Sequence, residues 1–139
     1  MKKSWGLIPK ILDGRKTIES RWGKNKSAPW HKVKVGETVY FKNAGEPVTV
    51  ATKVKKVIEF ERLNSRKVKE ILQKYGGEDG IAVSDIKKTF DWAREKRYCT
   101  LVYIEKAKRV RPFAIDKSGF GIGAAWISVP KIKDIKQAS

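Results

Sequence analysis

The chain has 139 residues, of which 32 are Lys or Arg and 15 are Asp or Glu, so its formal net charge is +17 at pH 7. This length accommodates one hydrophobic core and not two, and a hydrophobic content of 40% is too high for a disordered basic chain. No apolar run approaches the roughly 18 residues of a membrane span, and the first residues lack a secretory apolar region. We therefore expect a cytoplasmic protein without membrane association.

Cysteine and histidine usage restricts the chemistry further. The chain has one cysteine, Cys99, and one histidine, His31. A single cysteine cannot close an intramolecular disulfide, and the two residues together cannot supply an ordinary structural zinc site. We expect no metal and no cofactor.

The excess positive charge is spread along the whole chain and is not confined to a tail. Because like charges oppose compaction, this balance favours a polyanionic partner, with nucleic acid ahead of an anionic membrane surface. The alternative is a lysine-rich surface that serves solubility or heat resistance.

In chain order, the first half predicts one short helix and then strands. Residues 8–13 are typical of one or two helical turns that end at Gly14. A long loop rich in Gly, Ser, Pro, Asn and Lys follows at 23–31. Alternating and β-branched residues predict strands, the last with a bulge near Lys55 and Lys56, at 17–22, 38–42 and 48–60.

The second half predicts two helices followed by strands. Apolar residues at helical spacing indicate helices over 65–75, capped by Asn64 or Ser65, and over about 84–94. A strand at 98–104 is expected to extend irregularly to Ile115, before a glycine-rich loop and a final buried strand at 124–129. We expect a lead at 1–3, one domain over 4–130 and a polar tail at 131–139. These elements predict the α+β class, with a small mixed β-barrel of about five to six strands and two to three flanking helices.

The segment GRKTIESR carries a recognisable motif. Its pattern Gly-x-Lys-x-x-Glu-x-Arg, formed by Gly14, Lys16, Glu19 and Arg21, resembles the signature of the ASCH domain, the activating-signal-cointegrator homology domain, a relative of the PUA RNA-binding barrels. The order of elements around the motif is similar too, over about residues 4–129. The resemblance implies a small PUA-like β-barrel with a cleft beside the signature that binds RNA or a nucleotide-like ligand.

The residue types in the motif suit such a cleft. Alternation along a strand places Glu19 and Arg21 on the face opposite Ile18. Arg21 offers a planar fork to a phosphate or a base edge, Glu19 accepts hydrogen bonds from an exocyclic amine, and Lys16 is expected to be a mobile point charge. The alternative is an ordinary surface ion pair of Glu19 and Arg21 beside a solvated Lys16.

Two enzymatic alternatives remain open. In an ASCH branch that hydrolyses acetylated cytidine, the position matching Glu19 is a threonine nucleophile, assisted by the motif lysine and an acidic residue. Here Lys16 is present, and Asp79 matches the acidic residue better than Glu78, but a carboxylate replaces the hydroxyl. If the chain is an enzyme, the candidate catalytic residues are Lys16, Glu19 and Asp79. A metal-independent ribonuclease is the other possibility, drawing on Lys16, His31, Lys96 or Tyr98. Because His31 sits in the basic loop, we expect it to be a surface or stacking residue ahead of a catalytic group.

Further contacts are expected around the motif. Trp22 closes the motif strand, and Trp30 lies in the long basic loop. Each ring is placed either to stack on an unpaired base or to anchor the loop by hydrophobic packing. Trp92 and Trp126 are expected to pack in or near the core. Basic residues that would contact RNA are Lys24, Lys26, Arg109 and Arg111. We therefore expect a protein that binds single-stranded RNA or a modified nucleotide, and a protein partner remains possible.

Overall fold

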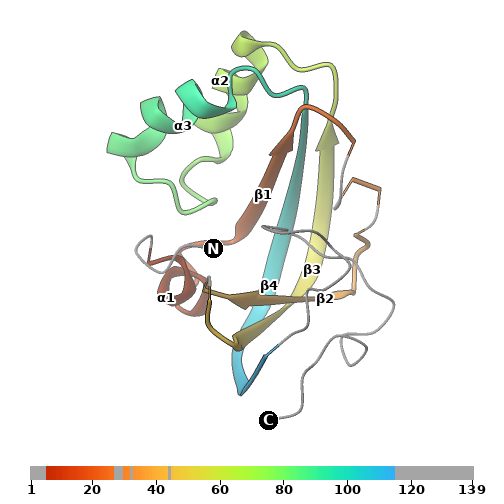
Figure 1. Ribbon diagram of the computed structural model, residues 1–139, viewed down its shortest axis with the longest axis vertical. Coiled ribbons are helices and arrows are strands. Elements are labelled where there is room, and N and C mark those ends of the chain that lie inside the picture. The colour runs from red at the N-terminus through yellow and green to blue at the C-terminus, as the bar shows by residue number, and fades with distance from the viewer. Residues whose placement is uncertain (1–5, 27–29, 32, 44, 115–139) are drawn as a thin grey trace.

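The computed structural model describes residues 6–26, 30–31, 33–43 and 45–114 (Figure 1). Within them, helices and strands follow one another in the order α1 (Leu7–Leu12), β1 (Ile18–Gly23), β2 (Thr38–Lys42), β3 (Val48–Phe60), α2 (Ser65–Tyr75), a 3-10 turn η2 (Val83–Asp85), α3 (Ile86–Ala93) and β4 (Tyr98–Phe113). The four described strands form one antiparallel sheet in the order β1-β4-β3-β2. The sheet curls into a half-barrel, which confirms the predicted α+β class; of the five to six strands expected, four lie among the described residues.

The local signals in the sequence explain where elements begin and end. The Asn64 side chain accepts a hydrogen bond from the Lys67 backbone N–H and caps α2 as expected. Gly14 follows α1 with φ +84°, the left-handed conformation that glycine adopts at little cost. The predicted bulge is present too, because the pairing of β3 with β4 shifts register between Val54 and Lys56. The bounds predicted for β2, β3 and α2 are confirmed, and α1 and β1 each differ by one residue at their ends.

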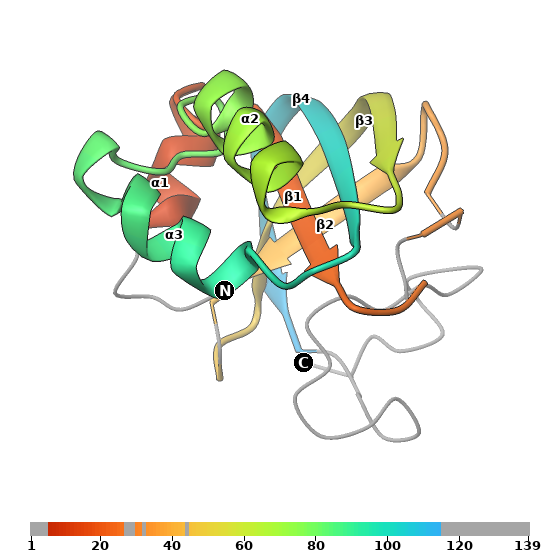
Figure 2. The same ribbon diagram turned by 90° about the horizontal axis from the view of Figure 1, so that it is seen from above.

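The sheet carries apolar side chains on both faces. On one face α2 and α3 lie together, and their apolar residues pack against Ile18, Cys99 and Leu101 of the strands (Figure 2). On the opposite face, which we call the inner face, the curled strands and α1 enclose a second cluster that contains Val50, Val54, Val102 and Ile104. Adjacent residues of β1 and β4 therefore point alternately toward the helices and toward the inner face.

Two expectations differ from the structure. The second predicted helix starts at Ile86 instead of about residue 84, because Val83–Asp85 form a tighter 3-10 turn. The expectation that Trp92 packs in the core is wrong: its side chain is 57% exposed. The apolar stripe of α3 faces α2 through Phe90 and Ala93, which turns Trp92 toward solvent.

Several expectations fall on residues outside the described ones. These are the lead at 1–3, the closing strand at 124–129 with Trp126, and the tail at 131–139. Among the described residues, no helix has the length and apolar composition needed to cross a membrane.

Candidate functional site

The motif residues Glu19 and Arg21 lie on the inner face of the sheet. In the pairing of β1 with β4, Glu19 is opposite Val102 and Arg21 is opposite Thr100. Residues directly opposite each other in an antiparallel pair share a face, and Val102 belongs to the inner cluster. The alternation predicted for this strand is therefore present, and it brings the two charged side chains together.

Lys16 is held in place, whereas the sequence predicted a mobile side chain. The residue is 3% exposed. Its Nζ donates to the backbone oxygens of Ile18, at 2.7 Å, and Asp79, at 2.6 Å, and to Asp79 Oδ1 at 2.7 Å. A lysine ammonium has three donors, so these three bonds use all of them. The physical reason is that the turn after α2 runs beside the edge strand β1, where the Thr17 and Ile18 backbone N–H groups both donate to the Glu78 oxygen.

Glu19 is a buried carboxylate that is only partly satisfied. The residue is 4% exposed, and its Oε1 accepts from Arg21 Nη1. Its Oε2 lies 3.6 Å from Lys16 Nζ and has no hydrogen-bond donor among the described residues. An unsatisfied buried acceptor costs free energy unless something donates to it. A ligand N–H or O–H that donates to Glu19 Oε2 would therefore contribute more binding free energy than the same donor contributes at an exposed carboxylate.

Arg21 connects this buried group to solvent. Its side chain keeps 29% of its surface exposed, and Nη1 also donates to the Ser20 backbone oxygen at 3.1 Å. A guanidinium has five donors in a planar fork. Arg21 is thus the cation of the cluster that a bound anion could reach.

Asp79 joins the cluster from the other side of β1. The Ser20 hydroxyl donates to its Oδ2 at 2.5 Å, and Ser20 Oγ accepts from Trp22 Nε1 at 3.2 Å. Burial raises the pKa of Asp79 above its ordinary value of 3.8, and the charge of Glu19 adds to that rise, while Lys16 and Ser20 oppose it. Of the two acidic residues considered from the sequence, Asp79 contacts Lys16, whereas Glu78 lies in the same turn and is exposed.

The inner face continues from Arg21 across the sheet to the basic loop. Thr100 is opposite Arg21 on one side and opposite Glu59 of β3 on the other. The Glu59 carboxylate in turn accepts the His31 backbone N–H at 2.7 Å and lies 3.3 Å from His31 Nε2. Arg21, Thr100, Glu59 and His31 thus form a polar row on one face.

The remaining expected contacts are distributed unevenly. Trp30 is 9% exposed, so its ring anchors the loop and is not an open stacking surface. Trp22 is half-buried against the helix-facing cluster. Lys24 and Lys26 are exposed just beyond β1, near the row, and Lys26 Nζ lies 5.8 Å from the centre of the Tyr98 ring.

The other expected cations lie apart from the motif. Arg109 and Arg111 are exposed near the far end of β4, beyond Lys106, and are not brought together with Arg21. Lys96 lies 4.8 Å from the centre of the exposed Trp92 ring at the end of α3. Among the described residues, no three His, Cys, Asp or Glu side chains gather as a metal site would require.

Sequence reasoning missed two members of the row, Glu59 and Thr100. The position of Glu59 after the bulge could have identified it. There it stands between the apolar residues Ile58 and Phe60, so alternation along the strand places Glu59 on the same face as Val57. A carboxylate at an inward position of a strand is unusual without a partner.

Comparisons with known proteins agree with this architecture. The structure is similar to the crystal structure of ASCH from Zymomonas mobilis, with a TM-score of 0.57 and 14% identity over 82% of this chain and 69% of that chain. The chain has an ASCH-like fold. Two single-residue variants of the Zymomonas mobilis protein match with the same TM-score and coverage of this chain, at 14% and 13% identity over 71% and 70% of their chains. No protein-family model and no curated protein matches the sequence.

The ASCH-like fold explains how an octapeptide can carry most of a site. The motif runs from the turn after α1 into the edge strand β1, so Lys16 meets the turn after α2 while Glu19 and Arg21 enter the inner face. At this level of identity the likeness gives the arrangement of the elements and not the ligand. The ligand has to be argued from the side chains.

Proposed function

We propose that this protein binds RNA and holds one unpaired nucleotide or modified nucleobase at Glu19 and Arg21. The observation that carries the proposal is the buried Glu19 Oε2, which has no donor among the described residues although Lys16 Nζ is only 3.6 Å away. The exocyclic amine of a base is a donor of the right kind. Arg21, beside it and 29% exposed, is suited to the phosphate of the same nucleotide.

The charge of the whole chain supports the same ligand class. A net charge of +17 raises the local concentration of any polyanion and speeds its association. For a protein that recognised only a neutral small molecule, that charge would not strengthen binding of the ligand. An unpaired base is the part of RNA that exposes its amine and ring faces to side chains.

Two variants test the proposal in titrations against a fluorescently labelled single-stranded RNA. Glu19→Gln keeps the size of the side chain but removes the charged acceptor, and Arg21→Gln keeps an amide donor toward Glu19 but removes the cation. Each is expected to weaken binding at least about 10-fold, since a hydrogen bond to a charged group has that effect. Arg66→Ala, on the exposed surface of α2, is the matched control and should bind as the wild type. Wild-type affinity in both site variants contradicts the proposal.

A second candidate function is hydrolysis of an acetylated nucleoside, and one observation favours it. The threonine of the related amidohydrolases is absent, but the Ser20 hydroxyl donates to Asp79, which also contacts Lys16. In this mechanism Ser20 Oγ attacks the acetyl carbonyl, Asp79 takes the hydroxyl proton, and the amine leaves with that proton before water cleaves the acyl-enzyme. Incubation with acetylated cytidine and chromatography should then show cytidine with the wild type and none with Ser20→Ala. No turnover by the wild type rules this candidate out.

A further inference from the structure

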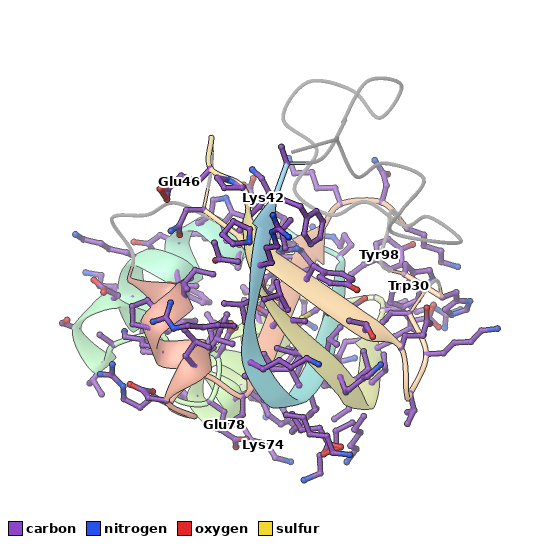
Figure 3. The ribbon with its side chains drawn as sticks, turned by 90° about the horizontal axis from the view of Figure 1, so that it is seen from below. Trp30, Lys42, Glu46, Lys74, Glu78 and Tyr98 are labelled. Atoms are coloured by element: carbon purple, nitrogen blue, oxygen red, sulfur yellow. The ribbon has the colours of Figure 1, made fainter. Side chains whose placement is uncertain are left out.

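A small aromatic cluster closes the end of the inner face next to the motif. Trp30 packs edge-on against Tyr98, with ring centres 5.2 Å apart (Figure 3). The His31 ring is stacked on Trp30 at 5.1 Å with an interplanar angle of 12°. The inner ring of the cluster, Trp30, is therefore buried. The outer ring belongs to His31, whose side chain is 70% exposed.

Glu59 fixes His31 in this position. One carboxylate oxygen accepts the His31 backbone N–H at 2.7 Å, and the other lies 3.3 Å from the ring Nε2. His31 also has φ +55°, a left-handed conformation that residues other than glycine adopt rarely. Such conformations persist where the surroundings impose them, and they are concentrated at functional sites. The imidazole is thus held with one ring face on Trp30 and the other toward solvent.

The cluster lies within reach of the motif. Arg21, Thr100 and Glu59 are direct neighbours on three adjacent strands. Neighbouring strands are about 4.8 Å apart, and two such spacings separate β1 from β3, so the backbones at Arg21 and Glu59 are about 10 Å apart. A dinucleotide can bridge that distance. Lys26, over the Tyr98 ring at 5.8 Å, adds a cation at the same end.

We propose that His31 stacks on the base next to the one held at Glu19 and Arg21, so that the chain binds two neighbouring nucleotides of single-stranded RNA. This inference rests on the proposed function and adds a second position to it. Histidine is one of the side chains on which unpaired bases stack. Trp30 Nε1 is a buried donor without a partner among the described residues, and an oxygen of this second nucleotide would satisfy it.

The single histidine of the chain gives a direct readout. In proton NMR spectra of the full chain, the carbon-bound imidazole protons belong to His31 alone. Titration with the four homodinucleotides of RNA should shift these signals upfield, because a stacked base shields them. The corresponding nucleoside 5′-monophosphates should leave them in place while binding at the motif. Dinucleotide binding without a shift of the His31 signals overturns the inference.

Substitutions give an independent test. His31→Asn removes the ring while Asn tolerates the left-handed conformation, and His31→Tyr restores a stacking surface. The first should weaken dinucleotide binding by about 5-fold or more and leave mononucleotide binding unchanged, and the second should restore it. Trp92→Ala removes another exposed ring, on α3, and should have no effect.

The outcomes separate this inference from the proposed function. If His31→Asn binds the dinucleotides like the wild type, the second position is wrong, even when Glu19→Gln still weakens both ligands. If Glu19→Gln and Arg21→Gln also bind like the wild type, the proposed function itself fails. Circular dichroism of each variant establishes that a loss of binding does not come from unfolding, and rescue by His31→Tyr provides the same control within the binding data.

Discussion

Lys16 Nζ lies 2.7 Å from Asp79 Oδ1, and both residues are more than 90% buried. A buried charge pair of this kind connects two segments, the motif before β1 and the turn after α2, that are far apart in the sequence. Its role is to position the site, because Lys16 has no donor left for a ligand. The charge that reaches outward belongs to Arg21.

Substitutions of Lys16 and Asp79 should therefore have strongly non-additive effects on the free energy of unfolding. Lys16→Met leaves the Asp79 carboxyl buried without its partner and is expected to cost about 3 kcal/mol or more. The double variant Lys16→Met with Asp79→Asn should cost less than the sum of the two single changes, by about 0.5 to 3 kcal/mol. Urea unfolding of the four proteins measures this. The exposed pair of Arg66 and Glu70 on α2 is the control, with changes below about 0.5 kcal/mol. Strict additivity at Lys16 and Asp79 would show that they do not interact.

The raised pKa of Asp79 predicts how the free energy of unfolding depends on pH. The sign is opposite to that expected for a surface carboxylate whose pKa is lowered by a neighbouring cation. Between pH 3.8 and the raised value, the folded state binds more protons than the unfolded state. The free energy of unfolding contributed by this group therefore falls as pH rises through that window, by at most about 1.4 kcal/mol per pH unit. Relative to Asp79→Asn, the wild type should lose stability as pH is raised from 3.8. A relative gain in urea titrations would mean that Lys16 outweighs burial.

The turn that carries Asp79 depends on a close approach at Gly76. A Cβ at this position would lie 2.4 Å from the Leu72 backbone oxygen and 2.7 Å from Ile86 Cδ1. Gly76→Ala is therefore expected to destabilise the protein by about 1 to 3 kcal/mol. Gly77→Ala, where a Cβ meets nothing within 4 Å, is the matched control and should change stability little. Equal thermal unfolding midpoints for the two variants would contradict this packing.

RNA binding should depend strongly on salt. If about four phosphates are contacted, the logarithm of the binding constant should fall with the logarithm of salt concentration with a slope near −3 on single strands. Arg21→Gln should reduce the magnitude of this slope by about 0.7, the contribution of one phosphate contact. Titrations at a series of salt concentrations measure both values. A salt-independent affinity would exclude phosphate contacts as the source of binding.

Much of the fold could be predicted from local patterns. The apolar spacing and Asn64 cap define α2, and the change of phase in the alternation locates the bulge of β3, because both signals act within a few residues. The motif placed Glu19 and Arg21 on one face for the same reason. These features follow from backbone geometry, which repeats with a fixed period.

What the sequence could not determine depends on contacts between distant segments. The sequence predicted a mobile Lys16. In the structure, the turn after α2 lies beside the edge strand β1 and supplies the two Asp79 acceptors that, together with the Ile18 backbone oxygen, immobilise the ammonium group. The sequence offered Trp22, Trp30 and His31 as rings that could stack on a base, and only the packing of Trp30 against Tyr98 shows that Trp30 is buried and that His31 is outermost. Burial and partnership are properties of tertiary packing, so residue type and spacing name the candidates and the fold decides which of them remain accessible.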